Sequence, residues 1–290
     1  MDAPARPYFF GKKLTVVGLA GVALLLLIAT VGPFVAPYDP AALSPARLQP
    51  PSTQHLMGTE NFGRDVFSRF LYGTRVSLFV GLGAVALGLV SGTLLGMFAG
   101  LRAGSAWDTL IMRVMDVILA FPLLVLVPVL AGILQARTLQ VGPIVLNSIA
   151  VVGVAIGLVS APVFARVARA SVLAEMREDY IMAARSFGVG SRDLLFGNLL
   201  PNIQAPLIVQ AAFSLAIAIA AEAAVSFLGL GVQPPDASWG TMLADARRFV
   251  ISGAWWLVVF PSIGIGVAVL SFNLVGDALR DALDPRAERH

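Results

Sequence analysis

Residues 178–202 read EDYIMAARSFGVGSRDLLFGNLLPN and form a polar segment in an otherwise apolar chain. In the first half of this polar segment, polar and apolar residues recur at helical spacing, which predicts a short amphipathic helix. Its apolar side is expected to consist of Tyr180, Ala183, Ala184 and Phe187. So short a helix is marginal alone. We therefore expect it to dock on another surface, either this protein's own helices or a partner.

Two glycines, Gly188 and Gly190, are expected to end this first helix. Gly188 is predicted to occupy a turn with positive φ, which glycine adopts at little cost. Ser191 is a suitable N-cap for a second helix, and Asp193 lies in its first turn. Pro201 is expected to end that helix before the next apolar run begins.

The composition identifies the environment of the chain. Of its 290 residues, 58% are hydrophobic and 13% charged, and the mean hydropathy is +0.84. Soluble domains are about 45–50% apolar. The sequence therefore predicts an integral membrane protein, of the all-α polytopic class.

Apolar runs of about 20 residues predict six membrane spans. They lie near 14–36, 77–101, 109–134, 144–167, 203–230 and 255–279. The third is expected to be kinked at Phe121-Pro122. The first resembles a secretory signal, but its apolar run is long and no small-x-small cleavage site is convincing, so we expect a retained anchor.

Lys and Arg placement predicts the orientation. With a cytoplasmic N-terminus, that side holds Arg6, Lys12, Lys13, Arg102, Arg113, Arg166, Arg169, Arg177, Arg185, Arg192, Arg280, Arg286 and Arg289. The other side holds Arg47, Arg64, Arg69, Arg75, Arg137, Arg247 and Arg248. Because cytoplasmic loops are enriched in these residues, we expect both termini inside. We divide the chain into a tail, first span and outer segment (1–76), a five-helix core with loop 168–202 (77–284), and a tail (285–290).

Missing residue types exclude several functions. The chain has no Cys, and its only His residues are His55 and His290, which argues against thiolate and histidine metal or catalytic sites. The only lysines, Lys12 and Lys13, do not follow a glycine-rich phosphate loop, so no ATP hydrolysis by this chain is expected. The basic residues are scattered among loops, and we expect no nucleic-acid binding.

Within the spans, glycine recurs every fourth residue from Gly88 to Gly104, which predicts close helix packing or else a sliding surface. Ionisable groups inside a membrane are costly and tend to face a cavity or a partner. Arg113 and Asp116, three residues apart, are expected to pair locally. Asp116 and Glu222 are candidates for lining a translocation path, although a hydrogen bond to a neighbouring helix also explains Glu222.

The polar segment resembles the EAA loop of ABC-importer permeases, through Ala183-Ala184, Gly188 and Leu200-Pro201. Met182 stands where the loop's namesake Glu is usual, and Tyr180-x-x-Ala-Ala-Arg185 is the form common in the peptide-importer branch. Further blocks are similar to dipeptide, oligopeptide and nickel permeases of the DppC/OppC type. They are His55-x-x-Gly-Thr59, Gly63-Arg-Asp65, Ser68-Arg69, Tyr72-Gly-x-Arg75, Met112-Arg-x-x-Asp116, Ala120-Phe-Pro122, Ser226 to Gly231, Pro234-Pro235, Trp239-Gly240, Gly276-Asp277, Arg280-Asp281 and Asp284-Pro-Arg286.

This resemblance implies a type I ABC-importer (MetI-like) fold in a bacterial or archaeal cytoplasmic membrane. The chain would form half of the path for peptides or another small solute, beside a homologous second permease of the DppB/OppB type. Two ATPase subunits, which bind ATP and Mg, would contact its loop, and an external binding protein would deliver the solute. Residues implied in coupling are Tyr180, Ala183, Ala184, Arg185, Phe187, Gly188, Leu200 and Pro201.

Two other classes of membrane protein also fit the composition. A secondary transporter or a channel subunit would work without an ATPase. A secondary transporter usually has more spans, inverted repeats and a buried charge pathway. ATP-independent uptake by the purified chain would favour one of these two alternatives.

Overall fold

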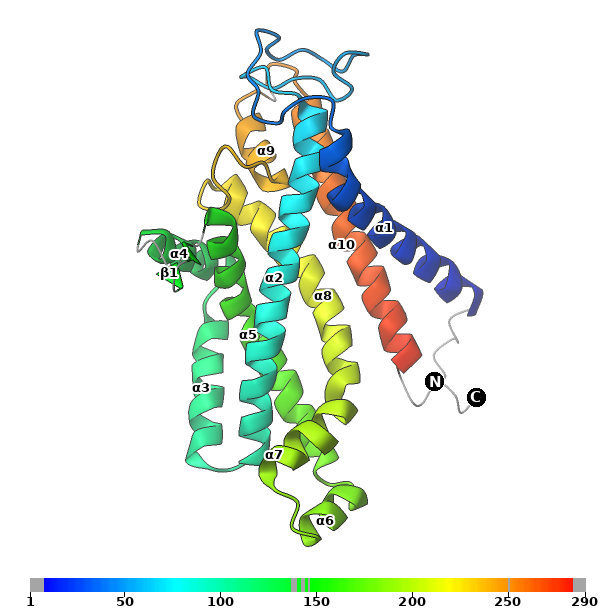
Figure 1. Ribbon diagram of the computed structural model, residues 1–290, viewed down its shortest axis with the longest axis vertical. Coiled ribbons are helices and arrows are strands. Elements are labelled where there is room, and N and C mark those ends of the chain that lie inside the picture. The colour runs from blue at the N-terminus through cyan, green and yellow to red at the C-terminus, as the bar shows by residue number, and fades with distance from the viewer. Residues whose placement is uncertain (1–7, 137–139, 142–143, 146, 250, 284–290) are drawn as a thin grey trace.

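The computed structural model describes residues 8–136, 140–141, 144–145, 147–249 and 251–283, and these form an elongated helical bundle (Figure 1). Its helices are α1 (Tyr8–Val35), α2 (Val66–Leu101), α3 (Ala106–Ala120), α4 (Leu123–Ala136), α5 (Ser148–Glu175), α6 (Asp179–Ser186), α7 (Ser191–Asp193), the π-helix η1 (Leu194–Leu199), α8 (Leu200–Phe227), α9 (Trp239–Ala246) and α10 (Trp256–Leu283). The short strands β1 (Gln140–Val141) and β2 (Ile144–Val145) pair antiparallel. The predicted helical membrane fold is confirmed, with this small ladder as an addition.

The two ends of the bundle differ in the segments they carry. α6 and α7 lie at one end, which we call the loop end (Figure 1). Residues 36–65 and α9 lie at the opposite end. Among the described residues, five single helices and one bent pair are long and apolar enough to cross a membrane, in agreement with six predicted spans.

The bent pair consists of α3 and α4, whose axes differ by 102°. The predicted kink at Phe121-Pro122 is therefore a complete break. Phe121 is extended (φ −84°, ψ 135°) because a residue before proline is disfavoured in the α region. A straight helix over 109–134 would reach across the bilayer, but here the chain turns sideways after α3.

Several span boundaries differ from the predicted ones, most of all those of α2 and α5. α2 begins at Val66, well before residue 77, because Asp65 caps it by accepting a hydrogen bond from the Ser68 backbone N–H at 2.8 Å. α5 begins at Ser148 rather than near residue 144, with Asn147 as its cap. It continues to Glu175, so the first part of the predicted loop 168–202 belongs to a span. Polar residues at helix ends hide such extensions from a search for apolar runs.

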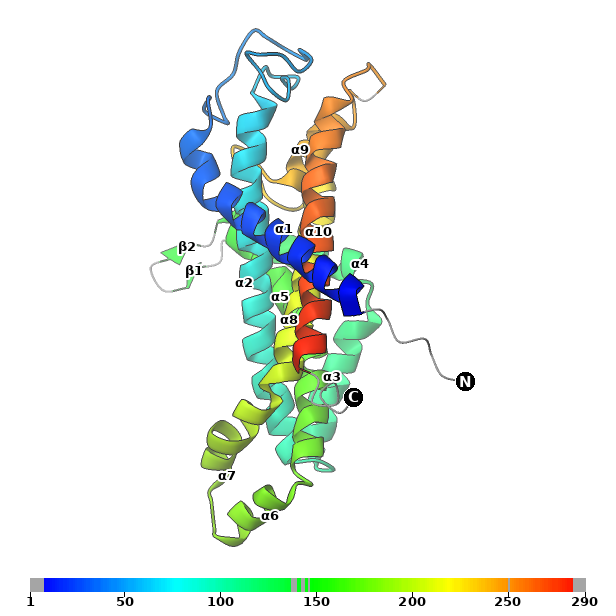
Figure 2. The same cartoon turned by 90° about the vertical axis from the view of Figure 1, so that its right-hand side faces the viewer.

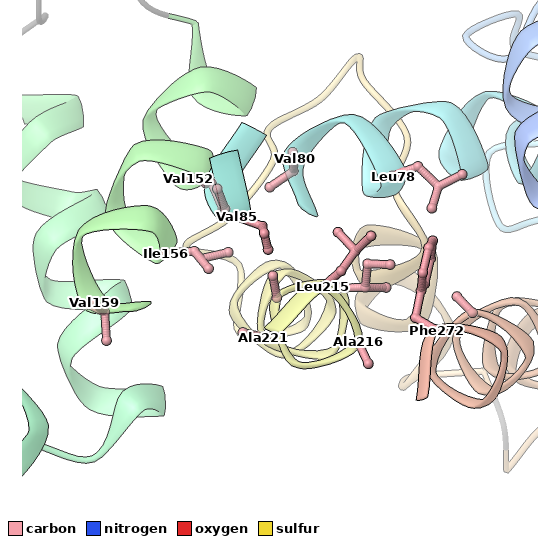
Figure 3. Close-up of a cluster of buried hydrophobic side chains, with 14 of the residues drawn as sticks. Leu78, Val80, Val85, Val152, Ile156, Val159, Leu215, Ala216, Ala221 and Phe272 are labelled. Carbon is pink, nitrogen blue, oxygen red and sulfur yellow. The ribbon is translucent and has the colours of Figure 1, made fainter. Parts of the chain in front are cut away.

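The apolar core lies where α2, α5, α8 and α10 meet, as Figure 3 shows. Leu78 and Val85 of α2 face Leu215 of α8, while Ile156 joins from α5 and Phe272 from α10. α1 crosses α10 obliquely (Figures 1 and 2). At Gly18 an added Cβ would lie 2.7 Å from Cβ of Leu274 in α10, which shows how closely α1 approaches.

The predicted glycine period marks the contact between α2 and α5. A Cβ on Gly92 would lie 2.2 Å from the Ala161 carbonyl oxygen, and one on Gly96 would lie 2.2 Å from that of Ala165. Gly88 and Gly100 likewise face α5. Gly104 does not belong to this row, because it lies in the turn after α2 with φ +79° and open space around it. Close packing, rather than a loosely sliding surface, is the arrangement present here.

Replacing Gly92 with Ala should destabilise the bundle, because its methyl group would overlap backbone atoms of α5. We expect a loss of about 1–3 kcal/mol, typical of overpacking. The measurement is the melting temperature of the detergent-purified protein by fluorescence-detected size-exclusion chromatography. Gly83→Ala is the matched control, since nothing lies within 4 Å of a Cβ there. Equal melting temperatures for the two variants would contradict the packing argument.

Candidate functional site

The polar segment 178–202 projects beyond the helices at the loop end, as both views show (Figures 1 and 2). It contains α6, the turn at Gly188, α7 and η1. η1 continues directly into α8. The segment therefore joins the end of one span, α5, to the start of another, α8.

The inner side of α6 docks on this protein's own bundle. Ile181 is fully buried and belongs to the core, and Ala184 packs against the core. The predicted apolar side, Tyr180, Ala183, Ala184 and Phe187, was expected to dock either on this bundle or on a partner. Of these residues Ala184 packs against the bundle, whereas Ala183 and Phe187 are exposed. Both sides of α6 carry apolar residues, so the sequence alone did not identify the side that meets the bundle.

Tyr180 ties α6 to both neighbouring spans. Its hydroxyl donates a hydrogen bond to the Glu175 carboxylate at the end of α5 and accepts one, at 2.8 Å, from the Asn202 side chain in α8. Burial, and next the Glu175 hydrogen bond, raises the pKa of Tyr180 to about 12. The phenol therefore stays protonated at physiological pH, and this tether is present below pH 10 and lost as pH rises through 12.

The outer side of this segment is apolar and exposed. Phe187 is 88% exposed and Met182 is 52% exposed, with Ala183 also on the surface. The Arg185 side chain lies outside the described part of the structure. Large apolar side chains exposed together mark interaction surfaces. The segment thus presents one apolar side to its own bundle and another to its surroundings.

The turn after α6 has the predicted geometry. Gly188 has φ +78°, and the Val189 N–H donates to the Ala184 carbonyl at 3.2 Å, closing the helix. An added Cβ on Gly188 would meet no atom within 4 Å, so backbone conformation, not space, requires glycine here. The predicted cap residue Ser191 has no described side chain.

The second predicted helix differs from expectation. Pro201 does not end it, because η1 and α8 form one continuous helical path from Leu194 to Phe227. The Leu200 N–H donates to the Leu195 carbonyl, five residues back, which is the π-helical pattern. Pro201 is near the start of α8, where the π-helical segment passes into the α-helix. Leu200 packs against the core, and Pro201 is exposed.

Glu222 is enclosed by protein and does not line an open path. It is fully buried and accepts hydrogen bonds from Ser77 of α2 at 2.9 Å and from Ser226 at 2.7 Å. Ser77 also accepts from the Trp239 N–H, at 3.3 Å, at the start of α9. Of the two predicted readings, the hydrogen bond to a neighbouring helix is therefore the one present, and the path assignment of Glu222 is corrected.

Asp116 pairs with Arg166 of α5, at 2.6 Å, and not with Arg113 as expected. Both side chains of this pair are about half exposed. Nearer the loop end, Asp108 and Arg169 form a second link between α3 and α5, through contacts of 2.6 and 2.8 Å. Arg166 was predicted only as one of the basic residues on the cytoplasmic side. Its pairing with Asp116 was not predicted, because fifty residues separate the two.

A charged cluster at the opposite end was also missed. Arg69 of α2 is buried beside Glu60 (3.5 Å), and both Arg64 and Arg69 lie 3.4 Å from Asp245 of α9. The motif Gly63-Arg-Asp65 pointed to this region but not to Asp245. The cluster fastens the segment before α2 onto α9. Among the described residues, no group of three or more His, Asp or Glu is placed to hold a metal ion.

Comparisons with known proteins place this geometry in context. Residues 92–289 match the family model described as "Binding-protein-dependent transport system inner membrane component", and residues 5–51 match "N-terminal TM domain of oligopeptide transport permease C". The di/tripeptide transport system permease protein DppC of Pseudomonas aeruginosa is 44% identical over 276 residues, covering 93% of this chain and 87% of the relative. The dipeptide transport system permease protein DppC of Escherichia coli K12 is 45% identical over 289 residues, covering 97% and 92%.

A solved structure shows the same fold. The crystal structure of an amino acid ABC transporter with histidines superimposes with a TM-score of 0.51 at 17% identity. The match covers 75% of this chain and 94% of that one. At this identity the likeness concerns the fold alone.

Replacing Tyr180 with Phe should loosen α6 by removing the hydroxyl that joins α5 and α8. We expect amide hydrogen exchange in residues 179–186 to accelerate about five-fold, the equivalent of one hydrogen bond worth about 1 kcal/mol. Tyr38→Phe is the control, because its hydroxyl donates to the Gln54 carbonyl at the opposite end. Unchanged exchange in Tyr180→Phe would show that the tether contributes nothing to the position of α6.

Proposed function

Because this chain belongs to the family of binding-protein-dependent transport system inner membrane components, we propose that it forms half of the translocation path of a peptide importer. It is a multi-pass membrane protein and a permease of the DppC/OppC type. The relatives' names make di- and oligopeptides the solutes we propose. The second half of the path would be a homologous permease of the DppB/OppB type.

The observation that carries the proposal is the exposed apolar surface of the polar segment. Phe187 is 88% exposed at the tip of a segment that is otherwise fixed to the bundle. We assign this surface to contact with two ABC ATPase subunits, which bind ATP and Mg. Coupling would use Tyr180, Ala183, Ala184, Arg185, Phe187 and Gly188 directly, with Leu200 and Pro201 at the start of α8. The chain itself is then not catalytic.

The tether of α6 explains how movement reaches the membrane. A force on α6 acts on α5 through Glu175 and on α8 through Asn202, since Tyr180 bonds both. Ile181, buried in the core, makes α6 move with the helices rather than slide over them. Closing and opening of the ATPase pair would thereby tilt two spans at once, in an alternating-access cycle.

Within the path, the exposed ion pair is the part that we assign to water-filled space. Asp116 and Arg166 are each about half exposed, in the second half of α3 and the second half of α5 respectively. Charged groups at such positions favour a cavity or a partner protein over lipid. Asp116 thus keeps its proposed place in the path.

The last part of the proposal concerns the orientation of the chain in its membrane. We place the loop end in the cytosol, expect both termini there as well, and turn the opposite end with α9 toward an external solute-binding protein. The membrane would be the cytoplasmic membrane of a bacterium or archaeon. This orientation follows from the Lys and Arg distribution.

A membrane pull-down with the tagged chain tests the proposal through Phe187→Asp. Since Phe187 buries almost no surface, the change should leave folding intact yet place a charge in the ATPase contact. We expect the wild type to copurify with its ATPase subunits. The amount of ATPase recovered with the variant should be at least tenfold lower, which is the usual effect of replacing a central contact residue.

Ile251→Asp is the control for this experiment, because Ile251 is 98% exposed and lies between α9 and α10. Retention of the ATPases by Phe187→Asp would sink the docking assignment. If the wild type recovers no ATPase and the purified chain moves solute without ATP, a channel or secondary transporter is the better description.

Gly188→Val should uncouple transport without affecting membrane insertion. A β-branched residue at φ +78° costs about 1–2 kcal/mol and would alter the angle of the turn. We expect solute-stimulated ATPase activity of the reconstituted transporter to fall at least tenfold. The control is Gly190→Val, two residues away, where φ is not positive and the nearest atom lies 3.9 Å from an added Cβ. Normal stimulated activity in Gly188→Val would argue against coupling through this turn.

A further inference from the structure

A cavity of about 300 Å³ separates the end of α2 from the polar segment. Phe98, Leu101 and Arg102 line it from the last turn of α2, and Val189 and Arg192 line it from the polar segment. Leucines of η1 complete the wall. The cavity is therefore mostly apolar, with two guanidinium groups, one from each side.

The two arginines are not neutralised. Neither Arg102 nor Arg192 forms an ion pair with any residue that the structure describes. Arg102 is held in place by its stacking over the Phe98 ring, 4.3 Å from the ring centre. Asp108, the nearest acid after α2, is already engaged by Arg169. Asp193 adjoins Arg192 in sequence but does not line the cavity.

The cavity adjoins the end of an apolar span, the level at which we place the change from hydrocarbon to headgroups. It begins where the apolar span α2 ends, and Trp107, in the first turn of the next helix, is 56% exposed. Exposed tryptophan at the end of a span is typical of the membrane interface. A ligand in this cavity can thus reach the headgroup layer and the acyl chains together.

From these observations we propose that the cavity binds the headgroup of an anionic phospholipid. Arg102 and Arg192 would hold the phosphate between them, through charge-assisted hydrogen bonds. Phe98, Leu101 and Val189 would contact the upper part of an acyl chain. Basic pockets beside spans are the usual form of such sites. The apolar side chains beside the two arginines favour a lipid over a free anion.

A lipid in this position would join α2 to the polar segment. The lipid would thus add a direct link from α2 to the part that we assign to coupling. The inference relies on the proposed function only for placing this end at the cytosolic face. It predicts that anionic lipid stabilises the segment.

Native mass spectrometry of the purified transporter, titrated with phosphatidylglycerol or phosphatidylcholine, tests the proposal. We expect at least a tenfold preference for phosphatidylglycerol. In the double variant Arg102→Gln/Arg192→Gln its affinity should fall roughly thirty-fold, from the loss of two basic contacts near a lipid surface. Arg177→Gln is the control, since Arg177 is exposed at the same end but does not line the cavity.

Three results would overturn the proposal. The first is equal binding of the two lipids, or unchanged binding by the double variant. The second is displacement of the lipid by millimolar inorganic phosphate, which would indicate an anion site. The third is a pair of results: the lipid binds the isolated chain but not the complete transporter, and the double variant loses ATPase subunits. Together these would assign the cavity to a protein contact. Recovery of ATPases by the wild type tests the proposed function separately.

Discussion

The close approach of α2 to α5 is the contact on which the rest of the bundle depends. In a membrane, helices gain little from burying apolar surface against each other, because lipid is equally apolar. They associate where small side chains let many atoms touch, and Gly92 and Gly96 bring α2 within reach of α5 carbonyl oxygens. Both ion pairs from α3 end on α5, and the polar segment starts from it. The positions of the two ion pairs and of the polar segment therefore depend on the contact between α2 and α5.

Polar groups secure the two ends of this apolar bundle in different ways. At one end Glu60, Arg64, Arg69 and Asp245 form a largely buried cluster, and Glu222 joins α2 to α8 nearby. At the loop end one phenol, Tyr180, with a single buried neighbour, Ile181, carries α6. The first arrangement joins several charged side chains from three segments, whereas the second consists of few contacts. Such a difference suits a protein that is driven from its loop end.

The sequence was sufficient for features that depend on neighbouring residues. Apolar runs predicted the spans, the Phe121-Pro122 pair predicted the bend after α3, and Gly188 predicted a turn with positive φ. Features that depend on distant residues were missed, such as the pairing of Asp116 with Arg166 across fifty residues. The sequence did not identify the side of α6 that meets the bundle, because Ile181 and Phe187 are similarly apolar and only the surrounding helices distinguish them. The glycine period gave a contact face but not its partner.

Compared with an α-helix, the π-helical segment η1 contains one additional residue per hydrogen-bonded turn just before α8. If those six residues were to tighten into an α-helix, everything before them would advance by one residue relative to α8. That is a rotation of about 100° and a rise of about 1.5 Å, with the helical hydrogen bonds exchanged rather than lost. The tip that carries Phe187 would then sweep sideways while the span below it kept its place. Such a change would make the π-helical segment the point at which the exposed tip turns relative to the membrane core.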